Sequence, residues 1–214
     1  MMTSFLIRNR TKEDYLEKIT NEPIGTQKNK RFTISNFEKF VANKFKEKTF
    51  DDVLEEINNL SNTEKEVALY DLLQDWINWN HHDGKNNSTI RAMFSFLRHY
   101  LYFRGVKTNP QDIKENLKFG KKIDNERHPL SKEEYMQIVN YFRNPKRQAL
   151  YLVLGSSGMR IGEALRLKKK DLDFSPERIK IKIPAEITKT RKGRSTYISK
   201  EASGKLKFNY YDWI

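Results

Sequence analysis

Apolar side chains return at the spacing of an amphipathic helix through the first half of the chain, and this pattern limits the fold more than any other feature. Four stretches carry it, at residues 35–45, 49–57, 62–80 and 89–104. Ser35 to Glu38 has the sequence of a capping box, and Thr49 is placed to cap the second helix. The pattern predicts a helical bundle of about four or five helices over residues 32–120.

The segments on either side of this bundle lack such a repeat. Residues 1–31 mix charge with few apolar side chains, which indicates a loosely held basic leader with room for one short helix. Residues 121–129 are charged and end in Pro129, which is typical of an exposed linker. A second domain is therefore expected over residues 130–214.

The second domain begins with helical signals and then changes period. Ser131 to Glu134 forms another capping box, a helix follows Pro145, and the stretch 156–174 is expected to hold a third helix. Isoleucine and lysine alternate over residues 179–183, which predicts a strand paired with residues 194–199 in a hairpin. The predicted fold class is mainly α with a small antiparallel β-hairpin.

Charge narrows the class of partner. The 214 residues hold 41 Lys and Arg against 28 Asp and Glu, a formal net charge of +13, which favours a polyanion such as nucleic acid. An anionic membrane surface is the competing partner, although no apolar run approaches the length of a membrane span. Cysteine is absent, and the four histidines lack metal-ligand spacing, so neither a metal nor another cofactor is expected.

One short motif carries a specific resemblance. The sequence SGMRIGEALRL, residues 157–167, resembles the first catalytic arginine motif of the tyrosine recombinase, or phage-type integrase, family. That motif has the form T-G-hydrophobic-R-hydrophobic-x-E-hydrophobic-x-x-L, and this chain departs from it with Ser157 and with the short apolar side chain of Ala164. A helical domain, a basic linker and a lysine-bearing hairpin stand in the family's order, which implies a SAM-like core-binding domain followed by an α+β catalytic domain.

The resemblance implies roles for four residues. Arg160 would grip the scissile phosphate, because a guanidinium offers forked donors to the charge of a pentacoordinate phosphorane. Gly158 would allow a tight turn before it, and Glu163 would orient it. Lys189 would be the hairpin general acid toward the leaving 5′ oxygen, with Lys192 and Arg194 as competitors for that role. The alternative is that these hairpin cations are phosphate contacts or solvated turn residues.

Double-stranded DNA is the partner that the resemblance implies. Basic residues of the linker, of the segment after the arginine motif and of the hairpin turn are candidate backbone contacts: Lys121, Lys122, Arg127, Lys168, Lys169, Lys170, Arg191, Lys192 and Arg194. The three lysines at 168–170 are equally consistent with a solvated face. Four aromatic residues at helical spacing are expected in the core rather than stacked on bases: Trp76, Trp79, Phe94 and Phe96.

The sequence departs from the family after the hairpin. The family continues with a His-x-x-Arg box and a tyrosine nucleophile, whereas no histidine follows His128 in these residues, and Tyr210 and Tyr211 lie too soon after Arg160. The chain is therefore expected to hold the first half of the catalytic domain and to be inactive by itself. A gene fragment, a truncated chain and a split recombinase completed by a second chain all fit this expectation.

Other functions stay open on the same residues. A non-catalytic DNA-binding regulator built on this scaffold is the main alternative to a recombinase subunit. An RNA-binding or membrane-surface protein is disfavoured, because the charge is spread over two folded units. A second recombinase chain or another copy of this chain on DNA is a further expected partner. The protein is expected to be associated with DNA in the cytoplasm of a prokaryotic cell, encoded by that cell or by its virus or plasmid.

Overall fold

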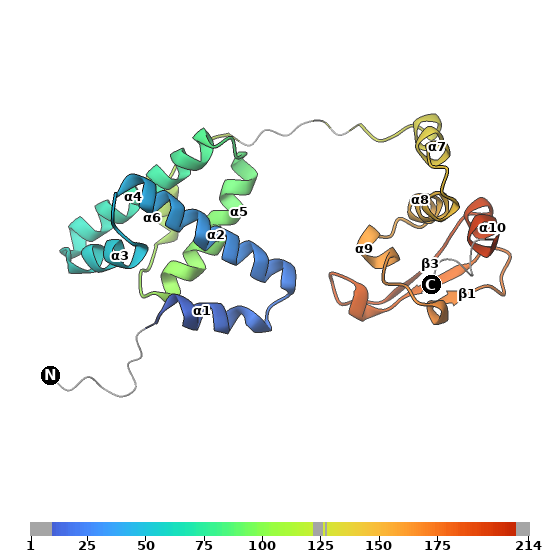
Figure 1. The fold of residues 1–214 in the computed structure, drawn as a ribbon, viewed down its shortest axis with the longest axis horizontal. Coiled ribbons are helices and arrows are strands. Elements are labelled where there is room, and N and C mark those ends of the chain that lie inside the picture. The colour runs from blue at the N-terminus through green and yellow to red at the C-terminus, as the bar shows by residue number, and fades with distance from the viewer. Residues whose placement is uncertain (1–9, 122–125, 127, 209–214) are drawn as a thin grey trace. The chain divides into compact units, whose positions relative to one another are not determined.

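The computed structural model describes residues 10–121, 126 and 128–208 (Figure 1). The chain divides into two compact units, Met1–Asn125 and Glu126–Ile214. Each unit has a hydrophobic core of its own. The boundary falls inside the segment 121–129 that the sequence predicts to be a linker.

The described part of the first unit is helical. Its elements are α1 (Lys12–Lys18), the 3-10 turn η1 (Ile19–Asn21), α2 (Ile24–Lys44), α3 (Phe50–Asn59), α4 (Asn62–His82), α5 (Asn87–Phe103) and α6 (Pro110–Asn116). Side-chain caps explain where several of them begin. Thr49 caps α3 in a capping box with Asp52, as predicted, and the Asn86 side chain caps α5. α5 ends at Phe103, and Arg104 is its C-cap residue.

The core of the first unit is built around Trp76. This indole is fully buried, packs against the ring of Phe37, and donates a hydrogen bond of 2.8 Å from Nε1 to Oδ1 of the buried Asn36. Phe94 is also buried, whereas Trp79 and Phe96 are half-buried. The prediction that Trp76 and Phe94 belong to the core is confirmed.

The predicted leader differs from the structure. Residues 12–31 form α1, η1 and the first turns of α2, and Tyr15 and Ile19 are buried in the bundle core. The capping box expected at Ser35 is wrong, because Ser35 lies inside α2, which begins at Ile24. Tertiary packing explains why the helix begins earlier than predicted. Ile34 and Phe37 are buried on one face of α2, and the turns before them extend the same helix.

The second unit combines helices with a small sheet. Its elements are α7 (Lys132–Tyr141), α8 (Pro145–Ser157), α9 (Ile161–Ala164), η2 (Lys169–Asp171), β1 (Leu172–Asp173), β2 (Lys180–Ile183), η3 (Ala185–Ile187), β3 (Arg194–Tyr197) and α10 (Lys200–Phe208). The Ser131 capping box starts α7, and the Asn144 side chain caps α8 ahead of Pro145. The fold class, mainly α with a small antiparallel sheet, is confirmed.

The sheet has three strands in the order β1-β2-β3, one more than the predicted hairpin. Both pairs are antiparallel, with Leu172 opposite Ile181 in the first and Ile183 opposite Arg194 in the second. Ile181 and Ile183 are buried, as the alternation of residues 179–183 requires. β1 escapes prediction because two residues are too few to show an alternating pattern.

Gly155 marks the tightest approach in this unit and gives a first prediction. A Cβ at Gly155 would lie 2.6 Å from Cζ of Tyr135, whose hydroxyl donates a hydrogen bond of 2.8 Å to the carbonyl of Tyr151. We expect Gly155→Ala to lower the free energy of unfolding of this unit by about 1 to 2 kcal/mol, because Tyr135 must move and lose that bond.

The matched control is Gly204→Ala in α10, where a Cβ would meet no atom within 4 Å. This change is expected to raise the free energy of unfolding by about 0.5 to 1 kcal/mol, since alanine favours the helix. Denaturant unfolding of both variants measures the difference. Equal stabilisation by the two substitutions would show that Gly155 is not closely packed.

Candidate phosphate-binding site

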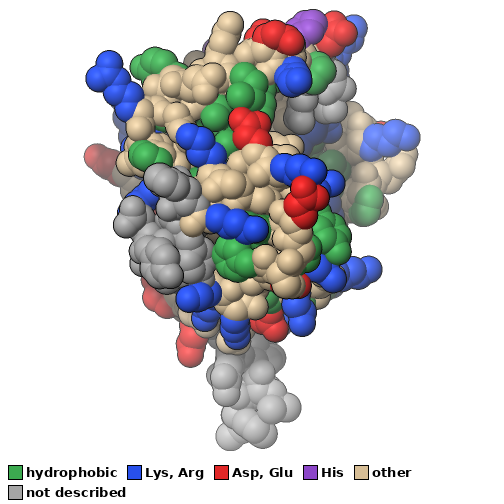
Figure 2. All heavy atoms as spheres, turned by 90° about the vertical axis from the view of Figure 1, so that its right-hand side faces the viewer, with side chains coloured by type: hydrophobic (Ala, Val, Ile, Leu, Met, Phe, Trp, Pro, Cys, Tyr) green, Lys and Arg blue, Asp and Glu red, His purple; other side chains and the backbone are tan. Residues whose placement is uncertain are grey.

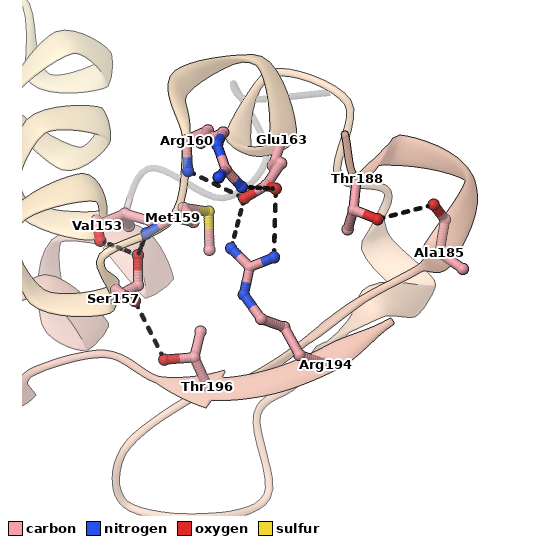
Figure 3. Close-up of polar contacts among 9 residues, drawn as sticks. All are labelled: Val153, Ser157, Met159, Arg160, Glu163, Ala185, Thr188, Arg194 and Thr196. Atoms are coloured by element: carbon pink, nitrogen blue, oxygen red, sulfur yellow. Dashed lines mark hydrogen bonds and ion pairs between the residues drawn. The ribbon is translucent and has the colours of Figure 1, made fainter. Parts of the chain in front are cut away.

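Arg160 stands in a short connection between α8 and α9. Gly158 ends α8 in the left-handed conformation, with φ of 65°, and its amide donates to the carbonyl of Leu154. The Ser157 hydroxyl accepts a hydrogen bond from the amide of Met159, whose side chain is buried (Figure 3). These contacts fix the backbone on the N-terminal side of Arg160, and Gly158 supplies the turn that a side chain with a Cβ would strain.

The helix after Arg160 is shorter than the sequence suggests. α9 has four residues, and Ala164 is its buried contact with the core. Ile161 and Leu165, which follow the helical pattern, are exposed instead. Arg160 therefore stands at the edge of a single helical turn and not at the head of a long amphipathic helix.

Glu163 holds Arg160 from inside the unit. Its side chain is 2% exposed, and its carboxylate accepts hydrogen bonds from the Arg160 backbone amide at 2.9 Å and from Arg160 Nη1 at 3.3 Å. The Arg160 side chain is 59% exposed. One edge of the guanidinium is thus turned toward Glu163, and the group stays open to a ligand from solvent.

Arg194 binds the same carboxylate from β3. Its Nη1 lies 3.2 Å from Glu163 Oε1 and its Nη2 lies 2.6 Å from Oε2, a bidentate ion pair (Figure 3). Sequence reasoning treats Arg194 as a DNA contact or a rival for the hairpin acid. In the structure its guanidinium binds Glu163, which lies 31 residues away in the sequence, and no local motif predicts this contact.

The two arginines keep Glu163 ionised. Hydrogen bonds from the Arg194 guanidinium, and next from the Arg160 amide, lower the pKa of Glu163 to about 2, against the desolvation that would raise it. The same pair raises the pKa of Arg194. Glu163 is therefore a fixed anionic acceptor at neutral pH and not a proton donor.

The hairpin turn carries basic side chains that face solvent. Lys189, Arg191 and Lys192 are exposed, and the turn is shaped by hydrogen bonds from Thr188 to the carbonyl of Ala185. No hydrogen bond or ion pair joins Lys189 or Lys192 to Arg160 among the described residues. The choice between Lys189 and Lys192 as the hairpin lysine therefore stays open.

The other predicted DNA contacts lie at three places. Lys168, Lys169 and Lys170 are exposed around η2, where the Lys168 amide donates to the buried Asp171. Lys121 is exposed, and its carbonyl accepts from the Asn87 side chain. Lys122 and Arg127 lie outside the described residues.

A groove borders this site, and sequence reasoning does not find it. The groove has a volume of about 620 Å³, and its lining includes Lys170, Lys182 and Arg194. Lys182 is a basic residue that the alternation of β2 turns outward, the one signal that could have singled it out. On the face drawn in Figure 2, lysine and arginine side chains are spread widely, with acidic ones among them.

Two features of the described residues bear on a bound metal and on a membrane. They contain no group of three or more His, Asp or Glu side chains placed to hold a metal ion. No helix among them is both long enough and apolar enough to cross a membrane.

Comparisons with known proteins agree with this geometry. Residues 128–210, which contain Arg160, Glu163 and Arg194, match the model of the phage integrase family. The second unit is therefore similar to the phage integrase family over most of its length.

A curated relative of the integrase family extends the likeness. The chain is 30% identical over 116 residues to a tyrosine recombinase XerC-like protein of Caldanaerobacter subterraneus subsp. tengcongensis. That match covers 51% of this chain and 30% of the relative.

Two solved structures share the fold. The Tn1549 transposon integrase, solved in complex with transposon right end DNA, matches 92% of this chain and 64% of its own, with a TM-score of 0.63 and 16% identity. The XerH site-specific recombinase, bound to palindromic difH substrate, matches 94% and 56%, with a TM-score of 0.57 and 18% identity. The chain thus spans less than two thirds of the length of these relatives.

Proposed function

We propose that this chain is a DNA-binding protein of site-specific recombination, in which Arg160 holds a backbone phosphate of duplex DNA. One observation carries the proposal: a solvent-facing guanidinium is held by a buried carboxylate inside the region that matches the integrase family. The relatives solved with DNA support duplex DNA as the partner. A bare lysine patch would give affinity without such an oriented fork.

The chemistry expected of Arg160 follows from its setting. A phosphodiester carries one negative charge, and a second develops as a nucleophile adds to phosphorus. A guanidinium with free N–H groups donates to two phosphate oxygens at once, so it favours the more highly charged state. Lys189, or Lys192 beside it, would protonate the leaving 5′ oxygen in the intact reaction.

Affinity for DNA would come from the exposed cations around this site. The proposed backbone contacts are Lys121, Lys122, Arg127, Lys168, Lys169, Lys170, Arg191 and Lys192. Phosphate contacts of this kind position a protein on a duplex without reading its sequence. Recognition of an attachment site is therefore not assigned to these residues.

Strand cleavage is proposed to need more than these 214 residues provide. Cleavage through a phosphotyrosine requires a nucleophile and a complete phosphate clamp, and no histidine follows His128 to begin a His-x-x-Arg box. Tyr210 and Tyr211 lie outside the described residues. The chain would act either as one subunit of a split recombinase or as a non-catalytic regulator at the same DNA, in a prokaryotic cytoplasm.

Covalent trapping tests this proposal. The protein is incubated with a nicked suicide duplex that carries candidate attachment DNA, and the products are run on denaturing and native gels. We expect retardation on the native gel that weakens with salt, and no DNA-linked protein on the denaturing gel. Absence of retardation at low salt would contradict DNA binding.

A covalent band would overturn the claim of incomplete catalysis. The control variants are then Tyr210→Phe and Tyr211→Phe, tested separately. Loss of the band with either one would identify that tyrosine as the nucleophile. Two additions separate the two remaining roles. A chain that carries the missing half of the catalytic domain should produce cleavage if this protein is a subunit of a split recombinase. Cleavage by an intact recombinase should fall in the presence of this protein if it is a regulator that occupies the site.

A further inference from the structure

The guanidinium of Arg194, in the hairpin region, is bound to a buried acid. Its two terminal nitrogens each reach one oxygen of Glu163, whereas Arg191 and Lys192 extend from the exposed turn just before it. The Arg194 side chain is 39% exposed, less than the 59% of Arg160. Two of the five N–H donors of Arg194 are therefore already directed at Glu163, one from each terminal nitrogen.

β3 ties Arg194 to the backbone that presents Arg160. Ile183 pairs with Arg194 across the sheet, and Thr196 donates from its hydroxyl to the carbonyl of Ser157 at 3.3 Å (Figure 3). Ser157 is the last residue of α8, three positions before Arg160. Strand and arginine loop are thus joined twice, once through Glu163 and once through this hydrogen bond.

Glu163 is shared by two cations, and this sharing sets its position. Arg160 reaches it through one guanidinium nitrogen at 3.3 Å, while Arg194 holds both oxygens at 2.6 and 3.2 Å. A carboxylate held at both oxygens cannot rotate, so the direction it offers to Arg160 is fixed. Among the residues that the structure describes, the other hydrogen bonds to the Glu163 carboxylate come from Arg160 itself.

We propose that Arg194 is a positioning residue that acts through Glu163 to aim Arg160 at the phosphate, and that it is not itself a phosphate contact. The proposal rests on the proposed function, because it names what orients the phosphate-binding arginine. It also predicts an unusual charge effect. Glu163→Gln removes one negative charge, which raises the net charge of the protein by one, and yet it should weaken binding to DNA.

A double-mutant cycle on the full chain tests the proposal. Affinity for one duplex is measured for Arg160→Ala, Arg194→Ala and the double variant, with circular dichroism and thermal unfolding to confirm that each is folded. Arg160→Ala is expected to weaken binding roughly 10- to 100-fold. Arg194→Ala should weaken it in the same direction, and the double variant should be no weaker than Arg160→Ala alone.

Conservative variants and a matched control sharpen the cycle. Arg194→Lys keeps the charge but cannot bind both carboxylate oxygens, so it should lose affinity as Arg194→Ala does. Glu163→Gln should do the same. Lys192→Ala, in the same hairpin, is expected to weaken binding additively with Arg160→Ala and to lower the salt slope by about 0.9.

A proton titration provides a readout that does not depend on DNA. In the wild type the pKa of Glu163 is about 2, chiefly because of Arg194. In Arg194→Ala, carbon-detected NMR should show this pKa rising toward the ordinary value of 4.5. DNA affinity of that variant should then fall more between pH 7 and pH 5 than that of the wild type.

The outcomes separate the two proposals. Additive losses for Arg160→Ala and Arg194→Ala, full retention of affinity by Arg194→Lys, or tighter DNA binding by Glu163→Gln would overturn the positioning role. An unchanged Glu163 pKa in Arg194→Ala would also overturn it. A wild-type protein that fails to bind duplex DNA would contradict the proposed function. The titration would still report whether Arg194 holds Glu163.

Discussion

Replacing Trp76 by alanine is expected to lower the free energy of unfolding of the first unit by about 3 to 5 kcal/mol. The indole is fully buried and contacts the Phe37 ring, so its loss opens a cavity in a core shared by several helices. The same change leaves Oδ1 of Asn36 without the hydrogen bond that it accepts from Trp76 Nε1. Native domains have a free energy of unfolding of about 5 to 15 kcal/mol, so this one substitution would remove a large fraction of it.

Two companion variants locate the cause of this loss. Trp76→Phe keeps most of the apolar volume but removes the hydrogen bond, so it should cost less than alanine. Trp79→Ala removes a half-buried ring and should also cost less. Because the two units have separate cores, amide signals of the second unit should survive in Trp76→Ala. Joint unfolding of both units would contradict that independence.

Raising the salt concentration from about 50 to about 200 mM is expected to weaken DNA binding roughly a thousandfold or more. The net charge is +13, and the proposed contacts include at least six exposed cations among the described residues: Lys121, Lys168, Lys169, Lys170, Arg191 and Lys192. Each phosphate that they neutralise releases condensed counterions, so the loss accumulates with the number of contacts. Fluorescence anisotropy across a salt series gives the slope.

The lysines at 168–170 provide the internal comparison. Replacing all three by alanine should lower the slope by about 2 to 3 if they contact phosphates, and leave it unchanged if they are only a solvated face. The same series with anionic lipid vesicles and with RNA tests the other polyanions. Tighter binding to vesicles than to duplex DNA would contradict the proposed partner.

The sequence predicts well wherever local chemistry decides the structure. Thr49 and Ser131 carry caps with a partner three residues later, and both begin helices as expected. Ser35 has the same local pattern and fails. The helix has already begun upstream at Ile24, where burial of Ile34 and Phe37 favours continuing it.

Contacts between distant residues account for what the sequence does not predict. Tyr15 and Ile19 are among the few apolar side chains of a charged segment, but both are buried in the bundle core. Arg160 and Glu163 are three residues apart, and the motif that contains both of them predicts their pairing. Arg194 lies 31 residues from Glu163, and only the folded sheet brings it there.

Strand pairing in the small sheet also controls the arginine. β3 has four residues, and Arg194 stands opposite Ile183 at one end of it. A slip of one residue would turn Arg194 to the opposite face of the sheet, away from Glu163. A hairpin in the wrong register could therefore keep the overall fold while Arg160 lost its orientation. Correct assembly of the site thus depends on the register of β2 and β3.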